Sequence, residues 1–299
     1  MKLNSSKVLI ILAFFAIYII WGSTYLLNKV AVTELPAFFI ATFRFLCASI
    51  LIFTIAKLSG KKLGITKKQL LNSIFVAFLF MVSGNGLFVW ALKYVDSGFA
   101  VLLASTQPLF VLLLMRLIDK KKMKPKSIIG VALGILGMYL LVSQNELITN
   151  EDTLLGTLLI FVCVLGWSYA SVFVSKADLP KNHLVSTGYQ MGIACFMLAP
   201  LSLGLGEEWT SPLDWSTNVQ WSMFLLIVFG SLVAFTAFNY LLKEVSTEKV
   251  ATSSYVNPVV ALLLGWWVLE EQLTTQSLIA AGILLIGVYF ITSRKKEIK

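Results

Sequence analysis

Long apolar segments alternate with short polar connections along the whole chain. The hydrocarbon core of a bilayer is about 30 Å thick, and a helix of about 20 apolar residues crosses it. Ten segments meet this requirement, at residues 8–30, 36–57, 69–92, 97–118, 125–143, 153–175, 183–204, 219–242, 249–269 and 275–293. The longest connection, residues 205–218, is too short to form a domain. The pattern therefore predicts an all-α membrane protein with ten transmembrane helices.

The pattern of the first half returns in the second half. The stretch Lys243–Glu271 matches Lys93–Met115 at an offset of 150 residues, and the match continues without a gap over about fifty residues. Distinctive residues coincide as well as the common apolar ones: Lys93 with Lys243, Pro108 with Pro258, Gly137 with Gly287, and Tyr139 with Tyr289. The chain is therefore predicted to be a duplication, with one repeat at residues 1–145 and the other at 146–299.

Each repeat holds five of the ten predicted helices. Because five is an odd number, the second repeat enters the membrane upside down relative to the first. Two inverted repeats around a central binding site are the plan of many secondary transporters, in which one half rocks against the other. The duplication therefore predicts two inverted five-helix repeats and a central site that opens to either side by alternating access.

The composition is that of a chain whose solvent is mainly lipid. Of the 299 residues, 58% are hydrophobic and 13% are charged, and the mean hydropathy is +0.85. Soluble domains carry about 25% charged residues. The formal charge of +9 does not indicate a nucleic-acid partner, because the basic residues stand in short loops between apolar segments. Such loops mark the cytoplasmic side of a membrane.

The distribution of these basic residues predicts the orientation. Of the 24 lysines and arginines, 21 fall on the side that holds both chain termini, whereas Lys29 and Lys93 fall on the other side. The positive-inside rule then places the N-terminus and the C-terminus in the cytoplasm. The alternation also supports ten helices, since a missed helix would disturb it.

Arg44 is the one full charge deep within a predicted helix. An arginine at that depth costs at least about 2.5–3.5 kcal/mol, so it must face protein or water and have a partner. It is either an anion-facing or gating residue, or a structural residue that binds helix carbonyl groups. Gln190 occupies roughly the corresponding place in the second repeat.

The acidic residues give a prediction about coupling. All 15 of them lie at or beyond the ends of predicted helices. Proton-coupled and sodium-coupled carriers usually need a carboxylate inside the membrane, as the group that titrates or binds the ion. The sequence therefore predicts facilitated diffusion or exchange.

Two tryptophans lie at matching places near the middle of the first and sixth predicted helices. They are Trp21 and Trp167, in the stretches IWGST and GWSYA. Tryptophan normally prefers the membrane interface, where its N–H group reaches water. Midplane tryptophans beside glycine and serine favour cavity walls, with close helix packing as the alternative.

Polar residues and prolines interrupt the third, fourth and ninth predicted helices. A proline within a helix bends it and frees a carbonyl group, and corresponding interrupted helices point to a transport site. Neutral amides and hydroxyls there suit a polar ligand that is uncharged or zwitterionic. The alternative is a pair of kinks satisfied by serine and threonine hydroxyls alone. The main residues are Asn85, Gln107, Pro108, Tyr255, Asn257 and Pro258.

The sequence has no arrangement typical of catalysis or metal binding. An intramembrane hydrolase needs a nucleophile with a base, paired aspartates or metal ligands. The single histidine, His183, lies at a helix end, and the three cysteines have no metal-ligand spacing. We therefore expect no enzyme activity, no cofactor and no metal. A membrane ligand-binding sensor without net transport is the alternative to a transporter.

Four stretches resemble the EamA branch of the drug/metabolite transporter superfamily. They are IWGSTYL (20–26), ATFRFLCA (41–48), NGLFVWALKYVDSGFAVLLASTQPLF (85–110) and SSYVNPVVALLLGWWVLEEQLT (253–274). The resemblance covers both halves. It implies ten helices in two inverted repeats around a central cavity. It also implies export or exchange of drugs or small metabolites, amino acids among them, across the bacterial inner membrane.

The resemblance also implies site residues and partners. A gating or structural role is expected for Arg44, Pro108, Pro258 and Gln190. The partners would be a small-molecule substrate and the lipid bilayer. The small-residue face of Gly130, Gly134 and Gly137 could pack within the monomer or across a homodimer. Residues matching the cavity positions are Trp21, Ser23, Asn85, Gln107, Trp167, Tyr255 and Asn257.

Overall fold

The computed structural model describes residues 5–91, 94, 103–120, 122–143, 153–269 and 273–293. Eight helices in these ranges are long and apolar enough to cross a membrane: Ser6–Asn28, Ala37–Leu58, Lys67–Leu87, Pro125–Val142, Leu154–Lys176, His183–Gly204, Thr217–Glu244 and Thr275–Thr292. The fourth and ninth predicted helices are present as shorter helices beside undescribed residues. The predicted all-α membrane fold is confirmed. The predicted boundary between the repeats lies outside the described residues.

The two halves contain similar series of elements. The first half contains α1 (Ser5–Phe15), η1 (Ala16–Ile20), α2 (Trp21–Ala31), α3 (Ala37–Leu58), α4 (Lys67–Ala77), η2 (Phe78–Leu87), α5 (Phe88–Ala91), α7 (Gln107–Asp119) and α8 (Pro125–Val142). The second half contains α9 (Thr153–Lys176), α10 (His183–Gly204), α11 (Thr217–Leu225), η3 (Leu226–Val233), α12 (Ala234–Glu244), α13 (Thr247–Val250), α14 (Ser253–Leu269) and α15 (Thr275–Thr292).

Helix starts follow from local sequence. Thr66 and Gln69 form a reciprocal capping box at α4, in which each side chain accepts a hydrogen bond from the backbone N–H of the other. The side chains of Asn182 and Thr274 accept backbone N–H groups at the starts of α10 and α15. Pro125 begins α8, where its missing N–H removes no helical hydrogen bond.

Three membrane helices contain π-helical stretches that the apolar pattern did not predict. They are η1 in the first helix, η2 in the third and η3 in the eighth. A π-helix has wider turns than an α-helix and is frequent at functional sites. The third and eighth helices correspond under the 150-residue offset, which places η2 and η3 at similar positions in the two halves.

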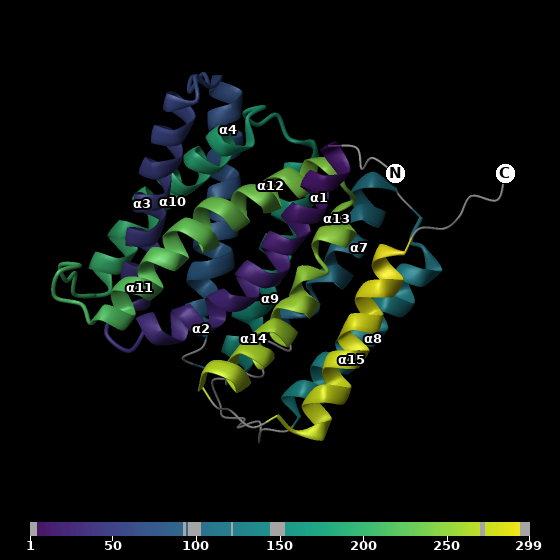
Figure 1. Cartoon of the computed structure of the whole chain (residues 1–299). Coiled ribbons are helices and arrows are strands. Elements are labelled where there is room, and N and C mark those ends of the chain that lie inside the picture. The colour runs from purple at the N-terminus through teal and green to yellow at the C-terminus, as the bar shows by residue number, and fades with distance from the viewer. Residues whose placement is uncertain are drawn as a thin grey trace.

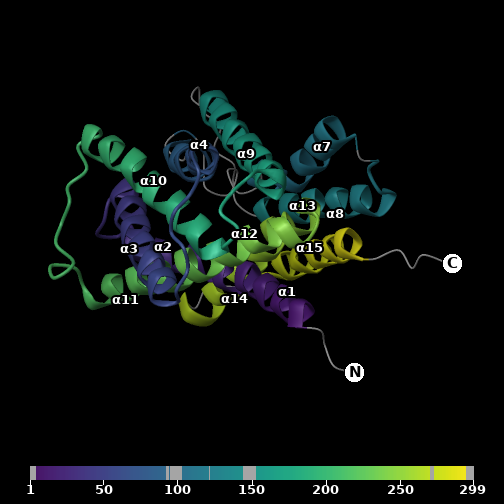
Figure 2. The same ribbon diagram turned by 90° about the horizontal axis from the view of Figure 1, so that it is seen from above.

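Helices of one half pack against helices of the other half. Figures 1 and 2 show α8 beside α15 on one flank and α3 beside α10 on the other. The first helix contacts the eighth and ninth, through α1 with α12 and through α2 with α11 and α14. The sixth helix, α9, contacts η2 and α7 of the third and fourth. Corresponding helices thus have corresponding neighbours.

The predicted small-residue face is buried within the chain, between α8 and α15. A Cβ atom added to Gly130 would lie 2.6 Å from the carbonyl oxygen of Gly287, and one added to Gly137 would lie 2.9 Å from Cγ of Leu284. The two backbones therefore approach closely, as small residues permit in membranes. Of the two uses predicted for this face, it serves packing within the monomer.

The first and last described helices, α1 and α15, share one end of the helix bundle. Figure 1 shows the start of α1, the connection between α3 and α4, and the end of α15 at the same end, which we call the basic end. The connection between α10 and α11, at residues 205–216, lies away from it. Basic residues gather there: Lys61 and Lys62 lie in the connection between α3 and α4, and Lys67 begins α4.

Candidate functional site

Trp21 and Trp167 meet at the centre of the molecule, with ring centroids 6.3 Å apart. Three phenylalanines join them to form what we call the central aromatic cluster: Trp21, Phe80, Trp167, Phe235 and Phe238. Neighbouring ring centroids in this cluster are 4.7 to 6.3 Å apart. The phenylalanines are buried and both tryptophans are half-buried. The cluster joins the first, third, sixth and eighth helices of the two halves.

Each tryptophan of the cluster lies against a glycine in a π-helical stretch of the other half. Trp21 Nε1 donates a hydrogen bond of 3.0 Å to the carbonyl oxygen of Gly230 in η3. A Cβ atom added to Gly84 in η2 would lie 2.6 Å from Cε3 of Trp167. The two tryptophans, which matched in sequence, therefore also have matching surroundings.

Polar side chains join the first and ninth helices. The hydroxyls of Tyr18 and Thr252 are 2.6 Å apart, and Thr252 Oγ1 donates to the Lys249 carbonyl at 2.5 Å, so Tyr18 is the donor between them. The Asn257 amide, oriented with its nitrogen toward the nearby carbonyls, donates to Ile17 at 2.9 Å and to Tyr18 at 3.2 Å. Asn257 thereby binds the backbone of η1.

Gln107 lies where the fourth, sixth and ninth helices meet. Its side-chain oxygen accepts a hydrogen bond from Ser254 of α14, and its carbonyl oxygen accepts one from Ser168 of α9 at 3.4 Å. Pro108 lies in the first turn of α7, and a turn at Ser105–Thr106 separates that helix from the helical residues Leu103 and Ala104. Pro258 lies inside α14 as predicted.

Ser23 and Asn85 bond within their own helices. Ser23 Oγ donates to the Ile20 carbonyl at 2.7 Å, and Asn85 Nδ2 donates to the Phe80 carbonyl at 2.9 Å. Both residues are half-buried. Asn85 follows Gly84, which lies against Trp167. Asn85 Nδ2 also donates to Met81 Sδ at 3.8 Å, so among the described residues it is the amide oxygen that remains for a ligand beside the central aromatic cluster.

Tyr255 does not join the other predicted site residues. Its ring is fully buried, at 0% exposure, against α8, where a Cβ atom added to Gly134 would lie 2.1 Å from Cζ of the ring. Its hydroxyl donates to the Val131 carbonyl at 3.5 Å. The expectation that Tyr255 lines the cavity is therefore corrected: Tyr255 packs the ninth helix against the fifth.

Arg44 and Gln190 both contact the eighth helix, at different depths. Arg44 Nε donates to Ser231 Oγ at 2.7 Å, in η3. Gln190 is buried and accepts a hydrogen bond of 3.1 Å from Asn239 in α12, while its own amide donates to Ser186. Asn239 also donates to Thr187 at 3.0 Å. Gln190 thus belongs to a buried amide network between α10 and α12.

Ion pairs and hydrogen bonds join helices at the basic end. Lys176 at the end of α9 pairs with the largely buried carboxylate of Asp119 at the end of α7. Lys243 of α12 donates to the Ala177 carbonyl at 2.7 Å. The buried carboxylate of Glu248 in α13 lies 3.6 Å from Lys124 Nζ. Two of these contacts fasten the end of the sixth helix to α7 and α12, and the third joins α8 to α13.

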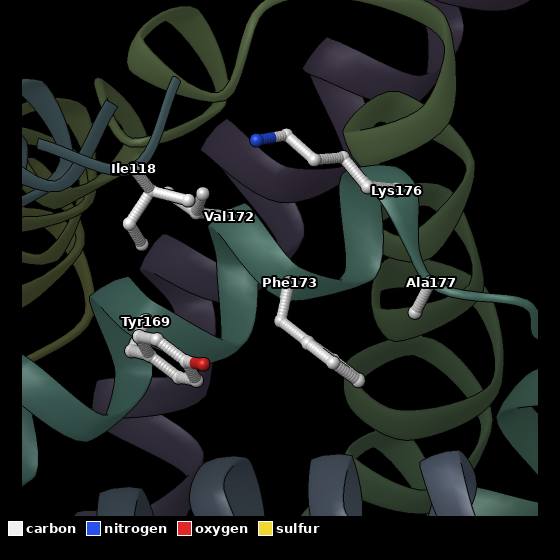
Figure 3. Close-up of a pocket in the computed structure, with 6 residues that line it drawn as sticks. All are labelled: Ile118, Tyr169, Val172, Phe173, Lys176 and Ala177. Carbon is white, nitrogen blue, oxygen red and sulfur yellow. The ribbon is translucent and has the colours of Figure 1, made fainter. Parts of the chain in front are cut away.

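A small pocket of about 240 Å³ lies beside the Lys176–Asp119 pair. Figure 3 shows a mostly apolar lining with the amine of Lys176 above it. Small-molecule sites are usually larger, about 300–1,000 Å³, and the pocket contains none of the predicted site residues. It is therefore not the predicted central site. Its lining residues are Ile118, Tyr169, Val172, Phe173, Lys176 and Ala177.

Acidic side chains organise helix starts at the opposite end. Glu207 accepts hydrogen bonds from the backbone N–H groups of Phe38 and Phe39, at 3.2 and 2.7 Å, at the start of α3. Glu34 accepts the backbone N–H of Ser216 at 3.0 Å, at the start of α11. Hydrogen bonds from the side chain and the backbone of Ser216 lower the pKa of Glu34 below its ordinary value.

Comparison with known proteins agrees with this architecture. The family model described as the EamA-like transporter family matches residues 8–143 and again residues 154–293. The chain belongs to the EamA-like transporter family. It is therefore a multi-pass membrane protein of a transporter family, and the predicted resemblance is confirmed.

Relatives in this family are named as transporters. The chain is 34% identical over 284 residues to the uncharacterised inner membrane transporter YedA of Escherichia coli strain K12, covering 95% of this chain and 90% of the relative. It is 25% identical to the uncharacterised transporter YoaV of Bacillus subtilis strain 168, covering 96% and 99%. One solved crystal structure has the same fold, with a TM-score of 0.81, 19% identity and 96% coverage of both chains.

Several central residues of this EamA-like chain were missed by sequence reasoning. Phe80, Phe235 and Phe238 lie in helices that are apolar on all sides, so no pattern distinguished their inward faces. Thr252 stands beside the polar stretch of the ninth helix but was not selected. A usable signal was the pair Gly84 and Gly230, which occupy similar places in the third and eighth helices and receive the two tryptophans.

Proposed function

We propose that the protein is a secondary transporter that exports or exchanges small polar metabolites, such as amino acids, or drugs, across the bacterial inner membrane. The observation that carries the proposal is the meeting of the first, third, sixth and eighth helices at the central aromatic cluster, between amide and hydroxyl groups. Membership of a transporter family supports it. Enzyme activity is not part of the proposal, because the family is one of transporters.

Alternating access is the proposed mechanism. The corresponding contacts of the first and sixth helices support two repeats that rock against each other around the central cluster. The repeats would be residues 1–145 and 146–299 in inverted orientation. The basic end, with both chain termini, would face the cytoplasm, since cytoplasmic loops carry the excess of lysine and arginine.

The proposed substrate pathway is lined by half-buried side chains around the cluster and by the buried side chain of Asn257. Aromatic faces and neutral amides suit a small ligand with apolar and polar parts. In the described membrane helices, acidic residues lie only near helix ends, which favours exchange or facilitated diffusion over coupling to protons or sodium. The lining residues are Trp21, Ser23, Asn85, Gln107, Trp167 and Asn257.

Counterflow in proteoliposomes tests the proposed function. Vesicles are preloaded with one unlabelled amino acid or metabolite at a time, and uptake of the labelled compound is followed without an ion gradient. Transient accumulation above equilibrium is expected for at least one compound. Flux that appears only with an imposed pH gradient would contradict the coupling proposal but keep transport. Ligands that bind without any flux would indicate a sensor instead.

Exchanging the charges of Lys176 and Asp119 tests whether transport requires this ion pair between α9 and α7. Lys176→Asp places two carboxylates together, and loss of a partner for a buried charge costs about 3–5 kcal/mol. The rate of counterflow should fall at least about 10-fold in this variant and also in Asp119→Lys. The double variant should recover most of the rate. Lys181→Asp, an exposed charge change next to α10, is the control. A double variant as slow as the single ones would contradict the role of the pair.

A further inference from the structure

Arg44 has fewer partners than its chemistry requires. A guanidinium carries five N–H donors and no acceptor. In the described part of the chain, Arg44 donates one hydrogen bond, from Nε to Ser231 Oγ at 2.7 Å, and its Cζ lies 5.1 Å from the ring centre of Phe45. No carboxylate among the described residues forms an ion pair with it. The two terminal nitrogens, with four N–H groups, are left without an acceptor there.

The guanidinium lies beside the proposed substrate pathway. Ser231 follows Gly230 in η3, and the carbonyl of Gly230 accepts the indole N–H of Trp21. The helix that carries Arg44 also borders η2, because a Cβ atom added to Gly86 would lie 3.2 Å from the Phe38 ring. Arg44 is half-buried. Arg44 therefore contacts η3 next to the residue that binds Trp21, on a helix that also borders η2.

We propose that Arg44 binds a carboxylate group of the transported substrate, which deepens the proposed function and rests on it. The planar guanidinium fork binds a carboxylate through two parallel hydrogen bonds, and such charge-assisted pairs are the strong ones. Ser231 takes the Nε donor and leaves the two terminal nitrogens for this contact. The substrate then supplies the counter-charge that the protein does not.

The charge balance selects a carboxylate over a phosphate ester. A phosphate monoester carries about −1.5 to −2 charge at pH 7, whereas Arg44 is the only basic residue deep in the described membrane helices. A single carboxylate neutralises one guanidinium, so a simple monocarboxylate leaves no net charge in the membrane interior, whereas an amino acid leaves only the charge of its own ammonium group. The proposed substrate class is therefore a small monocarboxylate or amino acid.

Matched acids and amides test the proposal. Counterflow is measured for pairs such as L-leucine and L-leucinamide, or L-phenylalanine and L-phenylalaninamide, with a phosphate ester as a further arm. Hydrogen bonds to a charged group are worth about 10- to 100-fold, so the wild type should prefer the acid by at least about 10-fold in kcat/KM. In Arg44→Gln the preference should fall to about one. Lys57→Gln, which removes an exposed charge from the same helix, should keep it.

Two further measurements keep the test decisive. If Arg44→Gln does not fold, Arg44→Lys replaces it, and its point charge should retain only part of the preference. Stabilisation of the purified protein by each ligand is also recorded as a shift in Tm. Carboxylates should stabilise the wild type and not the Arg44 variant.

The outcomes separate this inference from the proposed function. Equal flux of acids and amides in the wild type would overturn the role of Arg44 while transport stands. So would an unchanged preference in the Arg44 variant, or a preference for the phosphate ester. If no compound moves, the transport proposal fails. The shifts in Tm then decide whether Arg44 binds a carboxylate. An absence of stabilisation by any carboxylate would then overturn the inference as well.

Discussion

Replacing Gly134 by alanine should destabilise the protein more than any other glycine-to-alanine change in the described helices. The added Cβ atom would lie 2.1 Å from Cζ of the Tyr255 ring, closer than real atoms approach, and the ring is fully buried. Overpacking of this kind costs about 3 kcal/mol or more. We expect Tm in detergent to fall by at least about 5 °C and the yield of monodisperse protein to fall with it.

Gly282 provides the matched control for this prediction. It lies in α15, and a Cβ atom added there meets no atom within 4 Å. Gly282→Ala should therefore leave Tm unchanged or raise it, since alanine favours a helix by up to about 1 kcal/mol over glycine. Adding Tyr255→Leu to Gly134→Ala should restore part of the lost stability. A Gly134→Ala variant as stable as the wild type would show that Tyr255 lies elsewhere.

The position of Tyr255 shows what the sequence could and could not predict. Tyr255 and Asn257 stand together in one polar stretch and were assigned together to the cavity. Two residues along an α-helix are about 200° apart around its axis, so the two side chains face opposite ways. Asn257 bonds η1 and Tyr255 packs on α8. Helical geometry could have separated them, but only the structure shows which one faces the first helix.

The helices themselves were predictable because lipid imposes a simple rule on length and polarity. The apolar segments and most of their ends follow from it. The internal repeat pointed to Trp21 and Trp167 as a matching pair, but only the structure shows that their rings meet. The π-helical stretches were not predictable as such. The polar residues in η2 marked an interruption of the third helix but not its form, and η3 is apolar apart from Gly230 and Ser231. The form of the interruption at Pro108 was not predictable either: a turn at Ser105–Thr106 separates α7 from the helical residues before it, and Pro108 lies in the first turn of α7.

The second large effect is expected on transport, from the hydrogen bonds by which Asn257 joins the ninth helix to the first. We call these hydrogen bonds the joint. Asn257→Ala removes the amide that donates to the carbonyls of Ile17 and Tyr18 at 2.9 and 3.2 Å. Leaving a buried polar group without its partner costs about 1–3 kcal/mol. The first helix carries Trp21 four residues beyond Ile17, so loosening this joint should displace the central aromatic cluster. We expect counterflow to fall at least about 10-fold while folded protein is still obtained.

Asn257→Asp tests whether position 257 needs an amide that donates hydrogen bonds or only a polar side chain. Aspartate has nearly the shape of asparagine, but its carboxylate accepts hydrogen bonds and would face the Ile17 and Tyr18 carbonyl oxygens. It should therefore be less stable than Asn257→Ala, measured by Tm. Asn72→Ala is the control, because Asn72 donates a similar hydrogen bond of 2.9 Å to the Asp178 carbonyl at an exposed position and its loss should cost at most about 0.5 kcal/mol. If Asn257→Asp instead transports and melts like the wild type, the amide oxygen rather than its nitrogen faces η1. The joint would then depend on donors from the first helix.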